Sequence, residues 1–172
     1  MKTFELKIYY RGHNNSLYEL ESAGFTKLNY IPGTTVNSLL DEYTPKGVLG
    51  GSIAGLKGDL LVGACDSNDK ALGLFINNAA GYEWENDYAE ASGKAPFVNG
   101  QGTYGVFVYE THNEAGSAAL SYAAGDYLYC SVNGLLTKEA PGSNNVNPDS
   151  KFWVVVKAPT STDSEMIVEQ RI

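Results

Sequence analysis

The chain has 172 residues and a formal net charge of −8, with 43% hydrophobic and 19% charged side chains. This length fits one domain, or one domain with an added lobe. The acidic charge and the lack of a basic run argue against nucleic acid as a partner, because phosphates bind clustered Lys and Arg. No window approaches the roughly 18 consecutive apolar residues of a membrane span, and the charged N-terminus does not resemble a signal peptide. We therefore expect a soluble protein, made in the cytoplasm, with no membrane partner.

The N-terminal part, residues 1–50, is predicted to form a separate lobe or arm. Apolar and polar residues alternate from Phe4 to Ile8, which is typical of a half-buried strand over residues 3–10. Further along, Thr35 is placed to cap a short helix that reaches Tyr43. This lobe is therefore expected to carry one strand and one short helix.

The main β-domain is expected over residues 51–172, after a glycine-dense segment at residues 47–55 that predicts a flexible linker. Residues 58–65 and 70–76 are predicted to be the two strands of a hairpin, with a turn at residues 66–69 between them.

The middle of this domain alternates between surface and strand signals. Residues 79–103 are rich in acids and turn residues and predict a long surface excursion, whereas the run Val106–Glu110 predicts a strand. Residues 113–124 fit a short helix or a loop equally well, because alanines favour a helix and Gly116 weakens it.

The strongest β signal runs from Tyr122 to Ile172. Three β-rich runs are separated by turn residues such as Asn133-Gly134, and we expect the last run to be ordered and paired at the end of a barrel. With 19 glycines and 12 tyrosines, the whole chain favours an all-β fold. The predicted fold is a small β-barrel or sandwich with the N-terminal lobe attached.

Two cysteines, Cys65 and Cys130, lie among apolar residues of expected strands. This placement predicts two buried thiols. A disulfide between them stays open, because sequence spacing alone does not establish a pairing.

Motifs for catalysis, cofactors and metals are missing from the sequence. The two histidines, His13 and His112, lie in turn-rich segments and are interpreted as surface residues. The run Asp66–Asp69 is rich in oxygen but lacks the glycine and late glutamate of a calcium loop, so we interpret it as a turn, with weak cation binding as the alternative. The glycine-rich segments lack the Gly-Lys-Ser/Thr of a phosphate loop. We therefore expect that the protein is not an enzyme and that it has no cofactor and no metal site.

An acidic and aromatic segment at residues 82–90 is the one candidate site in the sequence. Tyr82, Trp84 and Tyr88 alternate with carboxylates there. Aromatic residues in such a loop suit contact with a protein or a sugar. A plain solvated loop is the alternative.

Residues 56–172 resemble a tailed-phage capsid decoration protein, also called a cement protein. The resemblance rests on a glycine-aspartate pair before each of two strands, a Gly-Val-Phe strand, and a turn followed by a valine-rich strand. These motifs are Gly58-Asp59, Gly105–Val108, Ala124–Tyr129, Asn133–Thr137 and Val154–Thr160.

The resemblance implies a non-enzymatic virion protein on the outer face of a phage capsid. Its partners would be the major capsid protein and further copies of itself, with a trimer as the favoured oligomer. Two alternatives stay open: a tail or head-fibre subunit, and a carbohydrate-binding module that uses Tyr82, Trp84 and Tyr88.

Overall fold

The computed structural model describes residues 4–11, 15–20, 47–66, 69–77, 79–80, 94–140 and 153–171. These residues form strands, turns and loops, and none of them is helical, so the all-β prediction is confirmed. The strands are β1 (Lys7–Arg11), β2 (Asn15–Leu20), β3 (Gly47–Val48), β4 (Ile53–Gly58), β5 (Leu61–Ala64), β6 (Lys70–Phe75), β7 (Ala79–Ala80), β8 (Lys94–Val98), β9 (Gly102–Val106), β10 (Tyr127–Cys130), β11 (Leu136–Thr137), β12 (Trp153–Lys157) and β13 (Met166–Gln170).

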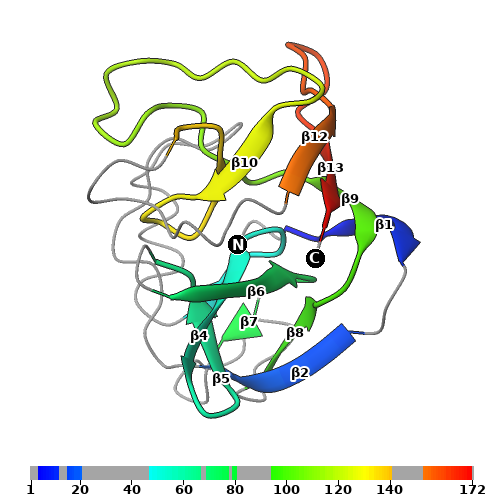
Figure 1. Ribbon diagram of the computed structural model, residues 1–172, viewed down its shortest axis with the longest axis vertical. Helices are drawn as coiled ribbons and strands as arrows, with labels where there is room; N and C mark the ends of the chain where they lie inside the picture. Colours follow the sequence, from blue (N-terminus) through cyan, green and yellow to red (C-terminus); the bar gives the residue numbers. More distant parts are fainter. Residues whose placement is uncertain are drawn as a thin grey trace.

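Five strands close into a barrel in the order β2-β5-β4-β6-β8, and β8 pairs with β2 to complete the ring. Neighbouring strands are antiparallel except β2 and β5, which run parallel. A second, open sheet has the order β1-β9-β13-β12-β10-β11 and is antiparallel throughout. Figure 1 shows the barrel in the lower half of the molecule and the open sheet above it and to the right. A short ribbon of β3 and β7 accompanies them.

Barrel strands that face the open sheet bury both of their sides. In β4, Ile53 belongs to the core shared with the open sheet, whereas its neighbour Ala54 points into the barrel. Leu74 and Phe75 divide in the same way in β6. This follows from the two-residue period of a strand, which sends successive side chains to opposite faces.

The core between the two sheets is sealed by a hydrogen-bonded pair. Trp153 is fully buried, and its indole Nε1 donates to Oε1 of Gln170 at 3.0 Å. The amide of Gln170 then donates to the carbonyls of Val98 (3.3 Å) and Gly100 (2.8 Å), where the chain leaves the barrel and enters the open sheet. Gln170 therefore ties the last strand of the open sheet to the end of β8.

Several predictions about local structure are confirmed. Phe4 and Leu6 are buried while Lys7 is exposed, as the alternation predicted, although β1 itself begins at Lys7. Cys65 and Cys130 are buried thiols. Residues 113–124 form a loop and not a helix. The expected helix from Thr35 to Tyr43 lies outside the described residues, and the division of the chain at residue 50 stays a prediction.

The flexible linker predicted at residues 47–55 is wrong. This segment contains β3 and the start of β4, and its residues from Val48 to Gly55 are buried. Gly50 lies directly against the carbonyl of Phe4, so a side chain at this position would collide with backbone. Glycine density here reflects close packing, which composition alone does not distinguish from flexibility.

The predicted hairpin of residues 58–65 and 70–76 is also wrong. Strand β4 lies between β5 and β6 and pairs with both of them, so the hairpin is formed by β4 and β5. Asp59 and Leu60 form its turn, and Leu60 adopts a left-handed backbone conformation (φ 55°). The prediction failed because the segment assigned to the linker was itself a strand.

Two further strand predictions need correction. The expected surface excursion at residues 79–103 contains β8, whose Ala95 and Phe97 are buried inside the barrel. The strand expected at Val106–Glu110 starts earlier, at Gly102, and ends at Val106, while Val108 and Tyr109 are buried beyond its end.

The three expected runs of the C-terminal stretch form β10, β12 and β13, with the short β11 in addition, and β13 is paired on both sides, with β12 and with β9. These strands lie in the open sheet, however, and do not close the barrel.

Candidate functional site

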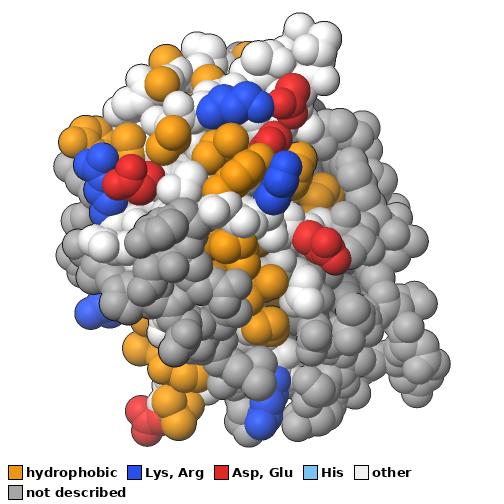
Figure 2. Space-filling view, turned by 90° about the vertical axis from the view of Figure 1, so that its right-hand side faces the viewer, with side chains coloured by type: hydrophobic (Ala, Val, Ile, Leu, Met, Phe, Trp, Pro, Cys, Tyr) orange, Lys and Arg blue, Asp and Glu red, His pale blue; other side chains and the backbone are white. Residues whose placement is uncertain are grey.

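The outer face, as we call the side of the six-stranded sheet that points away from the barrel, carries uncovered apolar side chains. Leu128 and Val155 point into the core, so their neighbours Tyr127 and Val156 point outward. Tyr9, Tyr127 and Val156 are 47%, 56% and 48% exposed. Figure 2 looks onto the side where β1, β9 and β13 lie, and shows hydrophobic side chains along this face with charged side chains among them in its upper half.

Strand irregularities place two of these exposed side chains. Tyr9 lies where the β1–β9 register shifts between Ile8 and Tyr10, and Val156 lies where the β12–β13 register shifts next to Lys157. A bulge inserts an extra residue into one strand and redirects its side chain. The shape of the outer face therefore depends on tertiary register, in addition to alternation.

A nearly buried carboxylate, Glu165, organises the charged part of the outer face. Its Oε1 accepts a hydrogen bond from the Tyr9 hydroxyl at 2.7 Å and lies 3.8 Å from Nζ of Lys7. The side chain lies across Gly105 of β9, where a Cβ would collide with the carboxylate. Glycine at this position thus allows the carboxylate to lie flat on the sheet.

Charges on the outer face are neutralised in pairs. Lys157 contacts Asp163 at 2.6 Å and Glu165 at 4.0 Å, and Arg171 contacts Glu169 at 3.0 Å. The hydrogen bond from Lys157, followed by the one from the backbone N–H of Glu165, holds the pKa of Asp163 below its usual value. A side-chain hydrogen bond with Tyr9 and then the charge of Glu165 raise the pKa of Lys7. Because these charged side chains have partners of opposite sign, the face offers apolar and aromatic contact more than net charge.

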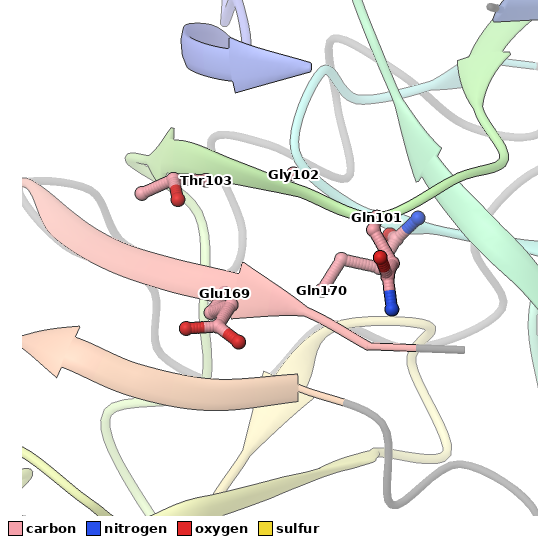
Figure 3. Close-up of a pocket in the computed structure, with 5 residues that line it drawn as sticks. All are labelled: Gln101, Gly102, Thr103, Glu169 and Gln170. Atoms are coloured by element: carbon pink, nitrogen blue, oxygen red, sulfur yellow. The ribbon is translucent and has the colours of Figure 1, made fainter. Parts of the chain in front are cut away.

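An open pocket of about 270 Å³ lies at the end of β13, beside the start of β9 (Figure 3). Its lining residues are Gln101, Gly102, Thr103, Glu169 and Gln170. Since the Gln170 amide is held by Trp153 and two carbonyls, the groups that the pocket presents are an amide, a hydroxyl and the Arg171-paired carboxylate. Such groups hydrogen-bond small polar molecules.

A buried carboxylate away from this face, Glu110, has a structural role. Its Oε1 accepts from Nδ2 of Asn133 at 2.7 Å, and its backbone carbonyl accepts from the Tyr122 hydroxyl at 2.5 Å. Burial, followed by the charge of Glu110, raises the pKa of Tyr122, so this hydroxyl remains a donor at neutral pH. These bonds fix the loop before β10 to the turn that follows it.

Four of the residues singled out in the sequence lie outside the described residues: Tyr82, Trp84, Tyr88 and His13. His112 is half-buried, with Nδ1 3.0 Å from the Thr111 hydroxyl.

Asp66 and Asp69, the ends of the expected turn, are joined by a hydrogen bond from the Asp69 N–H to the Asp66 carbonyl, and residues 67–68 lie outside the described part of the chain. Lys57 forms ion pairs with both carboxylates and so supplies a cation from the chain itself.

The outer-face residues Tyr9, Tyr127 and Val156 were not singled out from the sequence. A usable signal exists, because strict alternation around Leu128 and Val155 marks their neighbours as outward. What alternation does not indicate is whether another segment covers an outward side chain.

Within the described ranges, His, Cys, Asp and Glu side chains do not gather in a group of three or more that could hold a metal ion. The same part of the chain contains no helix that is long and apolar enough to cross a membrane. Comparison of the chain with known protein families, curated proteins and solved structures finds no match. The resemblance to phage decoration proteins therefore stays a prediction.

Proposed function

We propose that this chain is a structural, non-enzymatic protein that binds the outer surface of a tailed-phage capsid and stabilises it. In this role it contacts the major capsid protein and further copies of itself, with a trimer favoured, on the exterior of the virion after synthesis in the host cytoplasm. The sequence resemblance and the all-β architecture support the proposal.

The observation that carries it is the outer face, where Tyr127 and Val156 are exposed on a sheet whose acidic side chains have basic partners. Aromatic and apolar side chains with few unpaired charges characterise the centres of protein interfaces. A capsid presents many symmetric copies of its binding site, so each single contact can be weak. Because the charges are already paired, we expect binding to depend little on salt.

The test adds purified protein to expanded capsids that lack it, from the phage that encodes the chain. We expect co-sedimentation with capsids and a higher temperature of capsid disruption. The double variant Tyr127→Ser/Val156→Ser should lose most of the binding while its own unfolding is almost unchanged. The matched control Leu60→Ser removes an apolar side chain that is 66% exposed in the turn between β4 and β5, and it should bind normally.

Failure of the wild-type protein to bind capsids or to change their heat resistance would refute the decoration role. Labelling a tagged copy in intact virions then separates the alternatives, because label on the tail or on fibres indicates a tail or head-fibre subunit.

The pocket beside β13 favours a second candidate function, that of a carbohydrate-binding module. Gln101, Thr103 and Glu169 bring together an amide, a hydroxyl and a carboxylate, which are groups that hydrogen-bond sugar hydroxyls. Glycan-array binding that is lost in Gln101→Ala/Thr103→Val supports a site in this pocket, whereas loss in Trp84→Ala supports the aromatic segment. Absence of any glycan binding by the wild-type protein excludes both.

A further inference from the structure

The two cysteines come from different sheets and meet in the core. Cys65 directly follows β5 of the barrel, and Cys130 is the last residue of β10 in the open sheet. Both are almost completely buried, at 1% and 0% exposure, and belong to the same hydrophobic cluster. The Cys65 thiol, followed by burial, raises the pKa of Cys130, which agrees with their place in one cluster.

Backbone packing holds the two segments together independently of the thiols. Gly134, in the turn after β10, approaches Cys65 so closely that a Cβ on it would lie 3.0 Å from the Cys65 carbonyl oxygen and 3.2 Å from its nitrogen. The Ile53 N–H donates to the Gly134 carbonyl at 2.7 Å, and the Cys65 N–H donates to the Ile53 carbonyl at 3.0 Å. The neighbourhood of the two cysteines is thus set by the fold.

We propose that Cys65 and Cys130 form an intramolecular disulfide that fastens the barrel to the six-stranded sheet when the chain meets a small-molecule disulfide. Thiolate attack by one cysteine on the small disulfide gives a mixed disulfide, and the second cysteine then displaces the small thiol. One Sγ–Sγ bond forms in the protein and one S–S bond breaks in the reagent. The two thiol protons leave with two small thiols, so the protein is oxidised by two electrons and the reagent is reduced by two.

The surroundings favour a structural link over a reactive thiol. The Cys65 thiol and burial both raise the pKa of Cys130, which lowers the thiolate fraction in the folded chain. The Sγ of Cys130 lies 3.3 Å from the Ser131 carbonyl, and the Sγ of Cys65 lies 3.5 Å from the Asp66 carbonyl. Exchange in the folded protein is therefore slow, and the link is protected once it has formed.

The experiment equilibrates the full chain in glutathione buffers of graded ratio, once under native conditions and once in urea, and then quenches by alkylation. A chain with two cysteines can form a disulfide even when it is unfolded. The informative quantity is therefore the ratio of the disulfide-formation constant of the folded chain to that of the unfolded chain in urea. We expect this constant to be at least about tenfold larger in the folded chain, because folding brings the thiols together and the disulfide restrains the unfolded chain. The oxidised protein should also unfold at a higher temperature, and a reductant should reverse that rise.

Peptide mapping identifies the linked pair, and the single variants Cys65→Ala and Cys130→Ala serve as controls whose unfolding temperatures should not depend on the redox buffer. A disulfide constant that is equal or smaller in the folded chain overturns the proposal. So does an oxidised protein that is less stable than the reduced one, or one that carries glutathione on either cysteine at equilibrium in place of the link.

Discussion

The five-stranded barrel is closed, whereas the six-stranded sheet is open and exposes Tyr127 and Val156 on one face. Inside the barrel, small and medium side chains such as Ala54, Ala95 and Val62 surround Phe75 and Phe97. The inner side of the open sheet instead carries large side chains, including the fully buried Trp153 and Tyr104. A barrel of few strands has little internal volume, so strands on opposite sides of the barrel lie close together and leave room only for few large side chains.

The two regions also use glycine differently. Gly73 in the barrel faces the carbonyl of Val98, which is backbone, whereas Gly105 in the open sheet faces the end of the Glu165 side chain. The first glycine permits the ring to close, and the second permits a carboxylate to lie across a surface. We therefore expect the barrel to tolerate change poorly and the open sheet to tolerate it better, most of all on its outer face.

The largest effect is expected from Gly73→Ala, because the added Cβ would collide with the Val98 carbonyl and neither strand can move independently in a closed ring. We expect a loss of about 3 kcal/mol or more in the free energy of unfolding, measured by urea denaturation followed by circular dichroism. Gly58→Ala is the matched control in the same barrel, since its nearest neighbours lie 3.7 Å away, and it should change stability by about 0.5 kcal/mol or less. Equal losses of stability in Gly73→Ala and Gly58→Ala would show that the close approach of the Val98 carbonyl does not make Gly73 the more sensitive position.

A somewhat smaller effect is expected from Gln170→Ala, which removes the connection between the open sheet and the end of β8. The indole N–H of Trp153 and the carbonyl of Gly100 lose their buried partner, so we expect a loss of about 2–3 kcal/mol. The neighbouring Glu169→Ala breaks only an exposed ion pair with Arg171 and should cost about 0.5 kcal/mol or less. Urea denaturation of both variants tests this, and a larger loss for Glu169→Ala would show that the buried amide does not matter.

On the outer face, Gly105→Ala should cost about 1–2 kcal/mol, because the obstructing atom belongs to a side chain that can move. The cost should fall by about 1 kcal/mol when Glu165 is already alanine, and a double-mutant cycle measures this coupling. Strictly additive losses would mean that the strain at Gly105 comes from the sheet itself.

The smallest effect concerns pH and the loop that precedes β10. The hydrogen bond from the Ala123 N–H, followed by the interaction with Lys138, lowers the pKa of Asp126 from its ordinary 3.8. Because the folded-state pKa is the lower one, this contribution is complete above about pH 4 and is lost as the pH falls through the folded-state pKa. Asp126→Asn should therefore be less stable than wild type by well under 1 kcal/mol at pH 7. The difference should vanish below the folded-state pKa, and a difference that persists there in thermal unfolding would rule out the charge as its cause.

Sequence reasoning reached the strand content of this protein through local patterns. Alternation from Phe4 to Ile8 predicted a strand and its buried side, because the two-residue period is a property of the chain itself. Runs of β-forming residues between turns predicted the strands β10, β12 and β13. The burial of Cys65 and Cys130 followed from their apolar neighbours in the same way.

Pairing was decided only by tertiary structure. No local signal states that β4 lies between β5 and β6, that β2 closes a ring with β8, or that β13 lies between β12 and β9, since each pairing joins segments through the space they share. Glycines near residue 50 illustrate the limit, because the same residues permit either a flexible linker or very close backbone packing.

For the outer face, too, the sequence predicted one part and only the tertiary structure decided the rest. Composition and turn patterns predicted that the chain is all-β, but they did not single out Tyr127 and Val156 as a surface. Only the folded structure decided that they stay uncovered, that bulges turn Tyr9 and Val156 to the same face, and that Glu165 lies across Gly105. The physical reason is that exposure and register depend on every segment packed nearby, whereas the direction of a side chain depends on its own strand.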